Sequence, residues 1–284
     1  MKKATYLLSI ILLNIFFISA QTQPDYAKWH GDSVDVIHYN IHLDITKLSS
    51  RTISGYTELT LTPKVESFDE FAIDLLKMNI DSIYLDGQKH SGFSYNDTII
   101  HINLSEQKLK GEEIKLQVFY NGSPKSDPQW GGFYMSNNYA YNIGVGMGSD
   151  PVCFGRTWFP CVDDFIDRAL YDYYITITDN MEVVCGGVKV DEIDHADNTK
   201  TAHWKSNQRY PTYLASVAVG DYAVINDVYE GVERDIPIQN YAYHDDSSGT
   251  VSSLRDLKKV MAIYEELFGP YRMDRIGYVT VPFG

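Results

Sequence analysis

Cysteine is scarce in this chain of 284 residues, with three residues in all. Small secreted domains that rely on disulfides carry many more, so a disulfide-rich scaffold is excluded. Two arrangements stay open. Cys153 and Cys161 form one disulfide and leave Cys185 free, or all three are small buried apolar side chains.

Positive charge is also scarce, because 24 Lys and Arg face 38 Asp and Glu and the formal net charge is −14. No stretch concentrates basic residues, and a surface that contacts nucleic-acid phosphates needs such a concentration. Nucleic acid is therefore excluded as an expected partner.

Long apolar runs are absent apart from one near the N-terminus. Residues 1–20 begin with two lysines, continue as a mostly apolar stretch and end with Ser19 and Ala20. This order is typical of a signal peptide, and the apolar stretch is short for a membrane span. Gln21 instead of Cys at the next position argues against a lipoprotein. We expect an exported chain, periplasmic or secreted, with no stable membrane anchor after cleavage.

Catalytic motifs are missing as well. None of the eight histidines is followed by Glu, so the His-Glu-x-x-His motif of zinc peptidases is absent. His38 and His42 have its spacing, but in a predicted strand of about 3.3 Å per residue their Cα atoms would lie roughly 13 Å apart. The chain is predicted to hold no metal and to be inactive alone.

Two further features receive plain interpretations. The glycine-rich residues 144–148 lack the flanking strand and helix of a phosphate loop, which predicts a flexible or close-packed loop. The acidic pairs at 163–164 and 245–246 could bind calcium or serve acid–base chemistry, but solvated acids are the simpler interpretation.

Short alternating segments are abundant between residues 34 and 243. Apolar and polar residues alternate with period two, and turn residues separate the segments. The predicted strands are residues 36–45, 56–62, 71–75, 98–102, 114–120, 171–177, 183–185, 201–204 and 214–219. This spacing predicts a mainly β fold, a large antiparallel β-sandwich or saddle.

The pattern changes near residue 250. Residues 250–268 predict one amphipathic helix, which Gly269 and Pro270 end. Its predicted buried face comprises Leu254, Leu257, Met261, Tyr264 and Phe268. Residues 278–281 predict a further strand. A helix and one strand cannot close a core, so this tail is predicted to open a second, α/β domain.

The most specific signal is the segment 156–164. Its Trp-Phe-Pro run sets two large rings before a rigid residue, a combination that fixes a loop on a sheet. Arg156 can pair with Asp163 or Asp164 and hold that loop closed. We assign a structural role to Arg156, Trp158, Phe159, Pro160, Cys161 and Asp163.

This segment resembles the Arg-x-Trp-Phe-Pro-Cys-x-Asp motif of the aminopeptidase N-like zinc metallopeptidases, the family that includes leukotriene hydrolase. Residues 211–222 are similar to its Pro-x-Tyr-Leu…Val-Gly-x-Phe/Tyr segment. Residues 268–275 are similar to its Phe-Gly-x-Tyr-Pro-Phe-x-Lys segment, with Arg272 and Met273 in place of Pro-Phe. The three matches follow the family's order.

The resemblance implies that residues 21–245 form the family's N-terminal β-domain and that residues 246–284 open a truncated, thermolysin-like catalytic domain. The family's Gly-x-Met-Glu-Asn/His segment and zinc motif would follow residue 284. The parent enzyme would remove N-terminal residues from peptides with a zinc-activated water, and this chain would form one wall of the substrate cavity. The implied partners are peptides and the missing catalytic domain, and the implied cofactor is zinc held outside this chain.

The resemblance also implies substrate-binding positions. The family usually places Glu or Gln five residues before the motif's arginine, where it binds the substrate amine. That position is Pro151 here, and Asp150 is the nearest carboxylate. Three explanations are open: Asp150 takes the place of the family's Glu or Gln, the alignment shifts by one residue, or the parent enzyme has an unusual specificity. In the first case Asp150 should lie at the mouth of the cleft, on the side of residues 278–284. Phe283 and Gly284 are implied to reach the substrate.

A second hypothesis is a free-standing secreted β-sandwich that binds carbohydrate or peptide without catalysis. Aromatic residues could form its platform: Trp130, Phe133, Tyr134, Tyr139 and Tyr141. The alternative is that these rings belong to a sheet core or a covering loop. The helix and strand after residue 250 argue against a self-contained module, since the helix alone would expose apolar surface.

Overall fold

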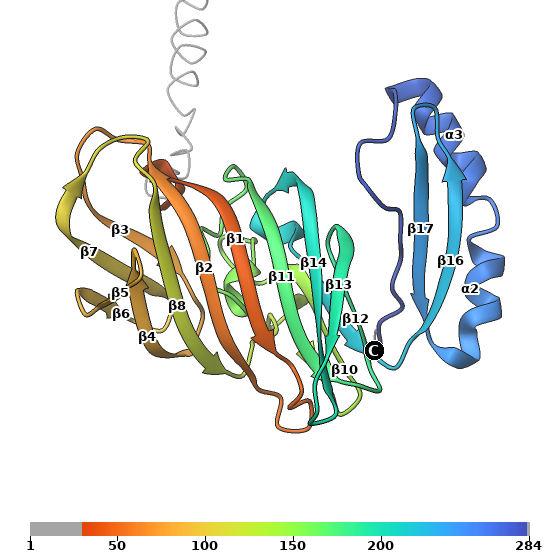
Figure 1. The fold of residues 1–284 in the computed structure, drawn as a ribbon, viewed down its shortest axis with the longest axis horizontal. Coiled ribbons are helices and arrows are strands. Elements are labelled where there is room, and N and C mark those ends of the chain that lie inside the picture. The colour runs from red at the N-terminus through yellow and green to blue at the C-terminus, as the bar shows by residue number, and fades with distance from the viewer. Residues whose placement is uncertain (1–29, 283–284) are drawn as a thin grey trace, which may run out of the picture.

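A computed structural model describes residues 30–282. The largest element is an eight-stranded sheet (Figure 1). Its strands are β1 (Val34–Asp44), β2 (Ile53–Pro63), β4 (Asn79–Leu85), β5 (Gln88–His90), β8 (Ile114–Gly122), β11 (Ala169–Thr178), β13 (Val188–Asp194) and β14 (Thr199–Tyr210). The order is β13-β14-β11-β1-β2-β8-β4-β5, antiparallel except that β1 and β11 run parallel. A 3-10 turn, η3 (His30–Asp32), precedes β1.

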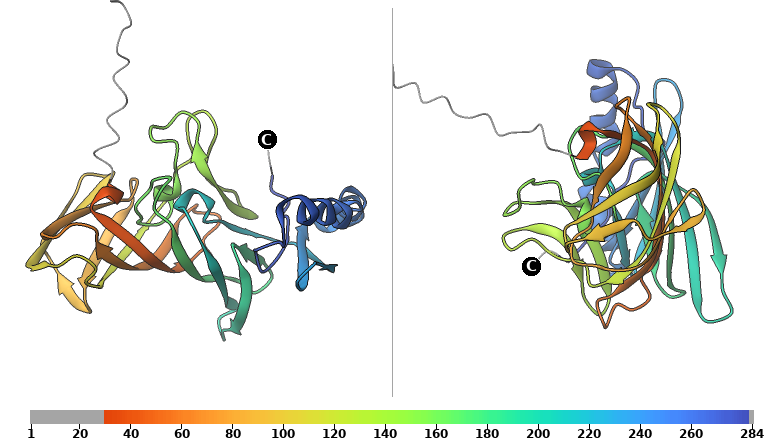
Figure 2. Two further views of the ribbon diagram at one scale, coloured as in Figure 1. Left: turned by 90° about the horizontal axis from the view of Figure 1, so that it is seen from above. Right: turned by 90° about the vertical axis from the view of Figure 1, so that its left-hand side faces the viewer.

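Two smaller sheets pack on this one. One contains β3 (Phe68–Asp74), β7 (Ile99–Lys108) and β6 (Phe93–Tyr95) in that order. The other has the order β12 (Glu182–Cys185), β15 (Val217–Gly220), β10 (Tyr139–Gly146) and β9 (Gly131–Met135). Figure 2 shows β9 and β10 on one side of the large sheet. The predicted glycine-rich loop is largely part of β10, where a Cβ on Gly144 would lie 1.9 Å from the Tyr213 carbonyl oxygen.

One hydrophobic core joins the three sheets. Tyr39, Ile41 and Leu43 of β1 alternate inward and are almost fully buried. Fully burying such a side chain contributes roughly 1.5–3 kcal/mol, so a core of several dozen apolar residues explains the sandwich. Asp86 and Gly87 both have positive φ and form the tight turn between β4 and β5 that an Asp-Gly pair predicts. The predicted mainly β fold is confirmed.

A second, smaller core follows. The hairpin of β16 (Ala223–Glu230) and β17 (Asp235–Ala242) packs on α3 (Leu257–Phe268), and α2 (Ser247–Ser253) precedes that helix. The predicted strand 278–281 lies parallel to β17, where the Tyr241 amide donates to the Tyr278 carbonyl at 2.8 Å. The predicted boundary after residue 245 therefore separates this hairpin from the helix that packs on it.

The predicted single helix is wrong in two respects. It breaks at residues 254–256 into α2 and α3, and of its predicted buried face only Met261 is buried. Tyr264 and Phe268 are 55% and 82% exposed. The reason is Glu265, which is buried because its carboxylate accepts hydrogen bonds from the Tyr229 hydroxyl and the amides of residues 232 and 271. An exposed apolar stripe remains on α3: Val260, Ile263, Tyr264, Leu267 and Phe268.

Some predictions concern other parts of the chain. The predicted signal peptide at residues 1–20 and the implied substrate positions Phe283 and Gly284 lie outside the described residues. Among residues 30–282, no helix is long and apolar enough to cross a membrane.

Candidate functional site

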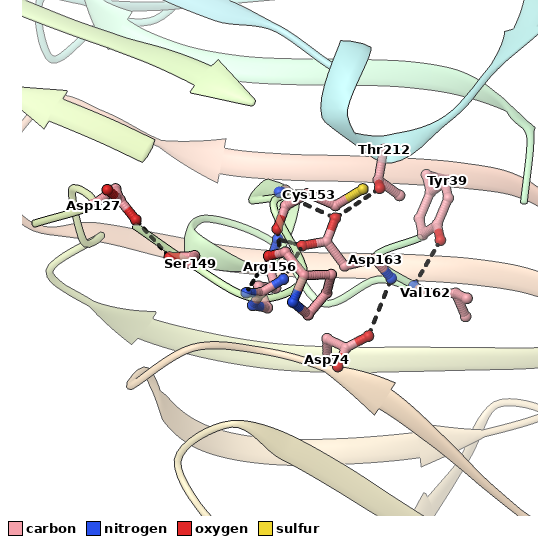
Figure 3. Close-up of polar contacts among 11 residues, drawn as sticks. Tyr39, Asp74, Asp127, Ser149, Cys153, Arg156, Val162, Asp163 and Thr212 are labelled. Atoms are coloured by element: carbon pink, nitrogen blue, oxygen red, sulfur yellow. Dashed lines mark hydrogen bonds and ion pairs between the residues drawn. The ribbon is translucent and has the colours of Figure 1, made fainter. Parts of the chain in front are cut away.

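The motif loop is organised by a buried ion pair (Figure 3). Arg156, in the turn η4 (Gly155–Thr157), donates from Nη1 to Asp163 Oδ2 at 2.9 Å. Asp163 also accepts the Gly155 amide at 3.1 Å and the Thr212 hydroxyl at 2.7 Å. Burial raises the pKa of Asp163 despite the opposing effect of Arg156. Of the two partners open from sequence, the arginine thus selects Asp163.

Further contacts hold this loop between the sheets. The Val162 amide donates to the Tyr39 hydroxyl of β1 at 3.0 Å, and the Asp163 amide donates to Asp74 of β3 at 3.1 Å. Trp158 is fully buried, and its ring centroid lies 4.6 Å from that of the next residue, Phe159. These contacts support a structural role for the motif, because its side chains pack in the interior and form hydrogen bonds within the protein.

All three cysteines are free and buried. The arrangement with three small buried side chains is therefore the one observed, and Cys153 and Cys161 do not form a disulfide. Burial raises the pKa of each thiol, so the thiols stay protonated and are poor nucleophiles.

Asp127 organises the loop that carries Asp150. Its carboxylate accepts the Gly148 amide at 2.9 Å and the Ser149 hydroxyl at 2.5 Å (Figure 3). Asp150 is exposed, and the Pro151 carbonyl accepts a hydrogen bond from the motif arginine at 3.2 Å. Asp127 was missed from sequence, although an Asp followed by Pro is a turn signal that could have indicated it.

The loop of Asp150 and the C-terminal segment lie on the same side of the large sheet. Figure 2 shows the segment ending at Pro282 on the side of β9 and β10 in both views. The Tyr141 hydroxyl of β10 donates to the Pro282 carbonyl at 2.7 Å. From Tyr141 to Gly146, the end of β10, the strand spans roughly 17 Å at about 3.3 Å per residue. The loop of Asp150 follows the opposite end of β10 from that contact, and a substrate-binding role of Asp150 stays a prediction.

No group of three or more His, Cys, Asp or Glu side chains is placed to hold a metal ion among residues 30–282. His38 Nε2 lies 2.8 Å from Asp172 Oδ2. The His42 ring stacks between Tyr56 and Tyr174, with centroid distances of 4.4 and 4.3 Å. The two histidines have separate partners on the outer face of the sheet, and the described residues do not fit a zinc site.

The two acidic pairs differ from each other. Asp163 and Asp164 are 3% and 2% exposed, so their interpretation as solvated acids is wrong. Hydrogen-bond donors compensate for their burial, and Asp164 Oδ1 accepts the amides of residues 166 and 167 at 2.9 and 2.6 Å. Asp245 and Asp246 are exposed in the short turn η6 (His244–Asp246), as expected of solvated acids.

The aromatic cluster is packed against itself. Phe133 and Tyr141 are buried, and Tyr134 stacks on Tyr141 with centroids 5.1 Å apart. The ring centroid of Tyr139 lies 5.2 Å from that of Tyr243, the residue after β17, and Trp130 is 40% exposed. Since most ring faces are covered by other rings, this arrangement favours the sheet-core interpretation over a binding platform.

Fold and loop together define a large β-domain followed by a hairpin and a helix with a small core of their own. Residues 36–214 match the family model described as the Peptidase M1 N-terminal domain, and the chain belongs to this family.

Individual relatives share low identity with the chain. It is similar to a leucine aminopeptidase 2 of Vanderwaltozyma polyspora, 23% identical over 206 residues, covering 69% of this chain and 30% of that protein. It is also similar to the transcription initiation factor TFIID subunit 2 of Drosophila melanogaster, 21% identical over 250 residues, covering 73% of this chain and 20% of that protein.

Solved structures share the fold. The M1 zinc metallopeptidase of Deinococcus radiodurans superposes with a TM-score of 0.79 at 19% identity, covering 89% of this chain and 57% of that chain. A mutant of that enzyme bound to a Tyr-Ser-Ala substrate gives a TM-score of 0.78 at 20% identity. The chain thus spans less than two thirds of the length of each of these proteins.

Proposed function

We propose that this chain is the N-terminal region of an exported zinc metallo-aminopeptidase and forms one wall of its substrate cavity. The complete enzyme would remove N-terminal residues from peptides, with zinc supplying an activated water. The described residues do not fit that zinc. Their contribution would be to support the catalytic domain and to orient the substrate.

The contact of Tyr141 with Pro282 carries this proposal. This hydrogen bond of 2.7 Å, from the Tyr141 hydroxyl to the Pro282 carbonyl, attaches the C-terminal segment that runs along β17 to strand β10 of the β-domain. The family resemblance places the substrate-binding segment directly after residue 284. A chain held in this way supports a cavity whose wall includes β9, β10 and the loop of Asp150.

Family membership supports the class of reaction without assigning catalysis to this chain. One relative is named as an aminopeptidase and another as a transcription-factor subunit. An activity test on the complete gene product is therefore the deciding experiment.

That experiment begins by sequencing the gene beyond the codon for Gly284. The proposal expects an open frame with Gly-x-Met-Glu and His-Glu-x-x-His, and a complete product that hydrolyses leucine 4-nitroanilide. A zinc chelator should abolish the activity, and N-acetyl-leucine 4-nitroanilide, which lacks the free amine, should resist hydrolysis. The chain of 284 residues should be inactive in parallel. A stop codon after Gly284, or equal hydrolysis of the blocked substrate, would overturn the proposal.

Two separate measurements test the finer assignments. In the complete product, Asp150→Ala should raise KM for free-amine substrates if Asp150 binds the amine, and an unchanged KM would remove that role. Export predicts a mature protein that begins at Gln21 and leaves the cytoplasm. Full-length protein retained in the cytoplasm would contradict it.

A further inference from the structure

A pocket of about 250 Å³ lies at the junction between the sheet of β10, β12 and β15 and the segment 275–281. Its walls include the apolar side chains Ile143, Val217, Val279 and Val281, with Ser216 exposed beside them. Arg275 also lines it. The pocket therefore combines apolar walls with one permanently charged group.

Within residues 30–282, the hydrogen bonds of the Arg275 guanidinium all go to backbone carbonyl oxygens. Nε donates to the Gly187 carbonyl at 2.8 Å, and Nη2 and Nη1 donate to the carbonyls of Cys185 and Gln239 at 3.1 and 3.3 Å. The guanidinium carbon lies 5.1 Å from the ring centroid of Trp204. A guanidinium has five N–H donors, so two remain after these three bonds.

The charge of Arg275 has no carboxylate partner within the described chain. No Asp or Glu of residues 30–282 forms an ion pair with it, and the adjacent Asp274 pairs instead with Arg234 at 2.8 Å. Burial lowers the pKa of Arg275, in keeping with the cost of desolvating an unpaired cation. A bound anion would offset that cost.

We propose that this pocket binds a small carboxylate with an apolar body, and that Arg275 pairs with the carboxylate group. The apolar walls would cover the body of the ligand, and the two remaining donors of the guanidinium suit a carboxylate. The volume is below that of pockets for drug-sized ligands, which restricts the ligand to a few more atoms than a single ring.

The ligand would bridge the β-domain and the segment that runs along β17. Arg275 and Val279 belong to the tail along β17, whereas Ile143 and Val217 belong to the β-domain. Because such a ligand binds only the folded junction, it stabilises the chain by mass action.

Thermal unfolding of the chain in benzoate, with sodium chloride at matched ionic strength, tests the proposal. Benzamide has the same shape without the charge and serves as the matched ligand control. At ten times its Kd benzoate should raise Tm by roughly 3–6 °C and the effect should saturate, whereas benzamide should give no shift. No benzoate shift up to its solubility limit, or an equal shift with benzamide, would overturn the proposal.

Variants locate the effect. Arg275→Lys keeps the positive charge but loses the planar set of guanidinium donors, and should remove most of the benzoate-induced rise in Tm. Ser216→Phe fills the pocket from its exposed side and leaves the contacts of Arg275 intact, so it decides the matter even if the first variant unfolds. Arg234→Lys, at an exposed ion pair, should keep the full shift. A shift that persists in Ser216→Phe would place the anion elsewhere and refute the site.

Discussion

Asp167 is a buried carboxylate whose ionisation should oppose folding. Its side chain is 1% exposed, Oδ1 accepts the Val36 amide at 3.3 Å, and Oδ2 has no hydrogen-bond partner within residues 30–282. Lys64 Nζ lies 3.7 Å away, while Asp164 and Asp35 add negative charge nearby. Burial, reinforced by these two acids and opposed by Lys64, raises the pKa of Asp167 to about 7.

The sign of the pH effect follows from this pKa. An unfolded Asp titrates near 3.8, so between about pH 4 and pH 7 the folded state keeps a proton that the unfolded state has released. The free energy of unfolding should therefore fall as pH rises through this window and level off above it. Roughly three pKa units at 1.36 kcal/mol each give a loss of about 4 kcal/mol.

Asp167→Asn keeps the shape of the protonated acid without its titration. Urea unfolding at several pH values from 4 to 8 should show equal stability of the two proteins at the acid end. At pH 8 the variant should be more stable by up to about 4 kcal/mol, a figure that already includes the attraction of the ionised carboxylate to Lys64.

The matched control is Asp127→Asn. Desolvation raises the pKa of Asp127, but hydrogen bonds from the Ser149 hydroxyl and three backbone amides outweigh it and lower the pKa to about 2. This variant should be less stable than the parent at neutral pH, and the difference should shrink as pH falls below about 4. If Asp167→Asn is less stable than the parent at pH 8, or if the stability difference between the two proteins does not change with pH, Asp167 does not titrate in the folded state as predicted.

Substitutions at three other positions test local interactions. Arg156→Met leaves the buried carboxylate of Asp163 without its ion-pair partner and should lower the free energy of unfolding by about 3–5 kcal/mol in urea, with a smaller loss for Arg156→Lys. Equal losses would show that the positive charge of Arg156 does not stabilise the fold. Glu265→Ala removes the acceptor of three hydrogen bonds and should speed amide hydrogen exchange in the β16–β17 turn but not in β1. Equally faster exchange in both regions would contradict the separation of the small core around α3 from the core of the β-domain. Leu267→Asp, on the exposed stripe of α3, should reduce association in light scattering without lowering Tm, and a lower Tm would mean that the stripe is already covered.

Local pattern was sufficient for the strands whose burial alternates with the pleat, whereas β4, β5, β6, β9, β10, β13, β16 and β17 were not predicted. In β2, and in β1 after the bulge at Val36 and His38, the inward residues are apolar except for Thr57, so period two indicates both the strand and its core face. The turn at Asp86 and Gly87 is likewise predictable from local sequence, because its geometry depends on two adjacent residues. The family motif likewise identified the segment around Arg156, whose ion pair joins two residues seven positions apart.

The errors arose where a polar group is buried by partners distant in the sequence. Glu265 turns the buried face of α3 because Tyr229, 36 residues earlier, donates to it, and a hydrophobic pattern assigns a glutamate to solvent. Asp163 is buried because Thr212, 49 residues later, completes its hydrogen bonds. Arg275 was noticed only as part of a motif, whereas its carbonyl partners lie 36 to 90 residues away. Since burial of a charge requires such partners, the buried charges of this chain could be located only once the fold had brought those partners together.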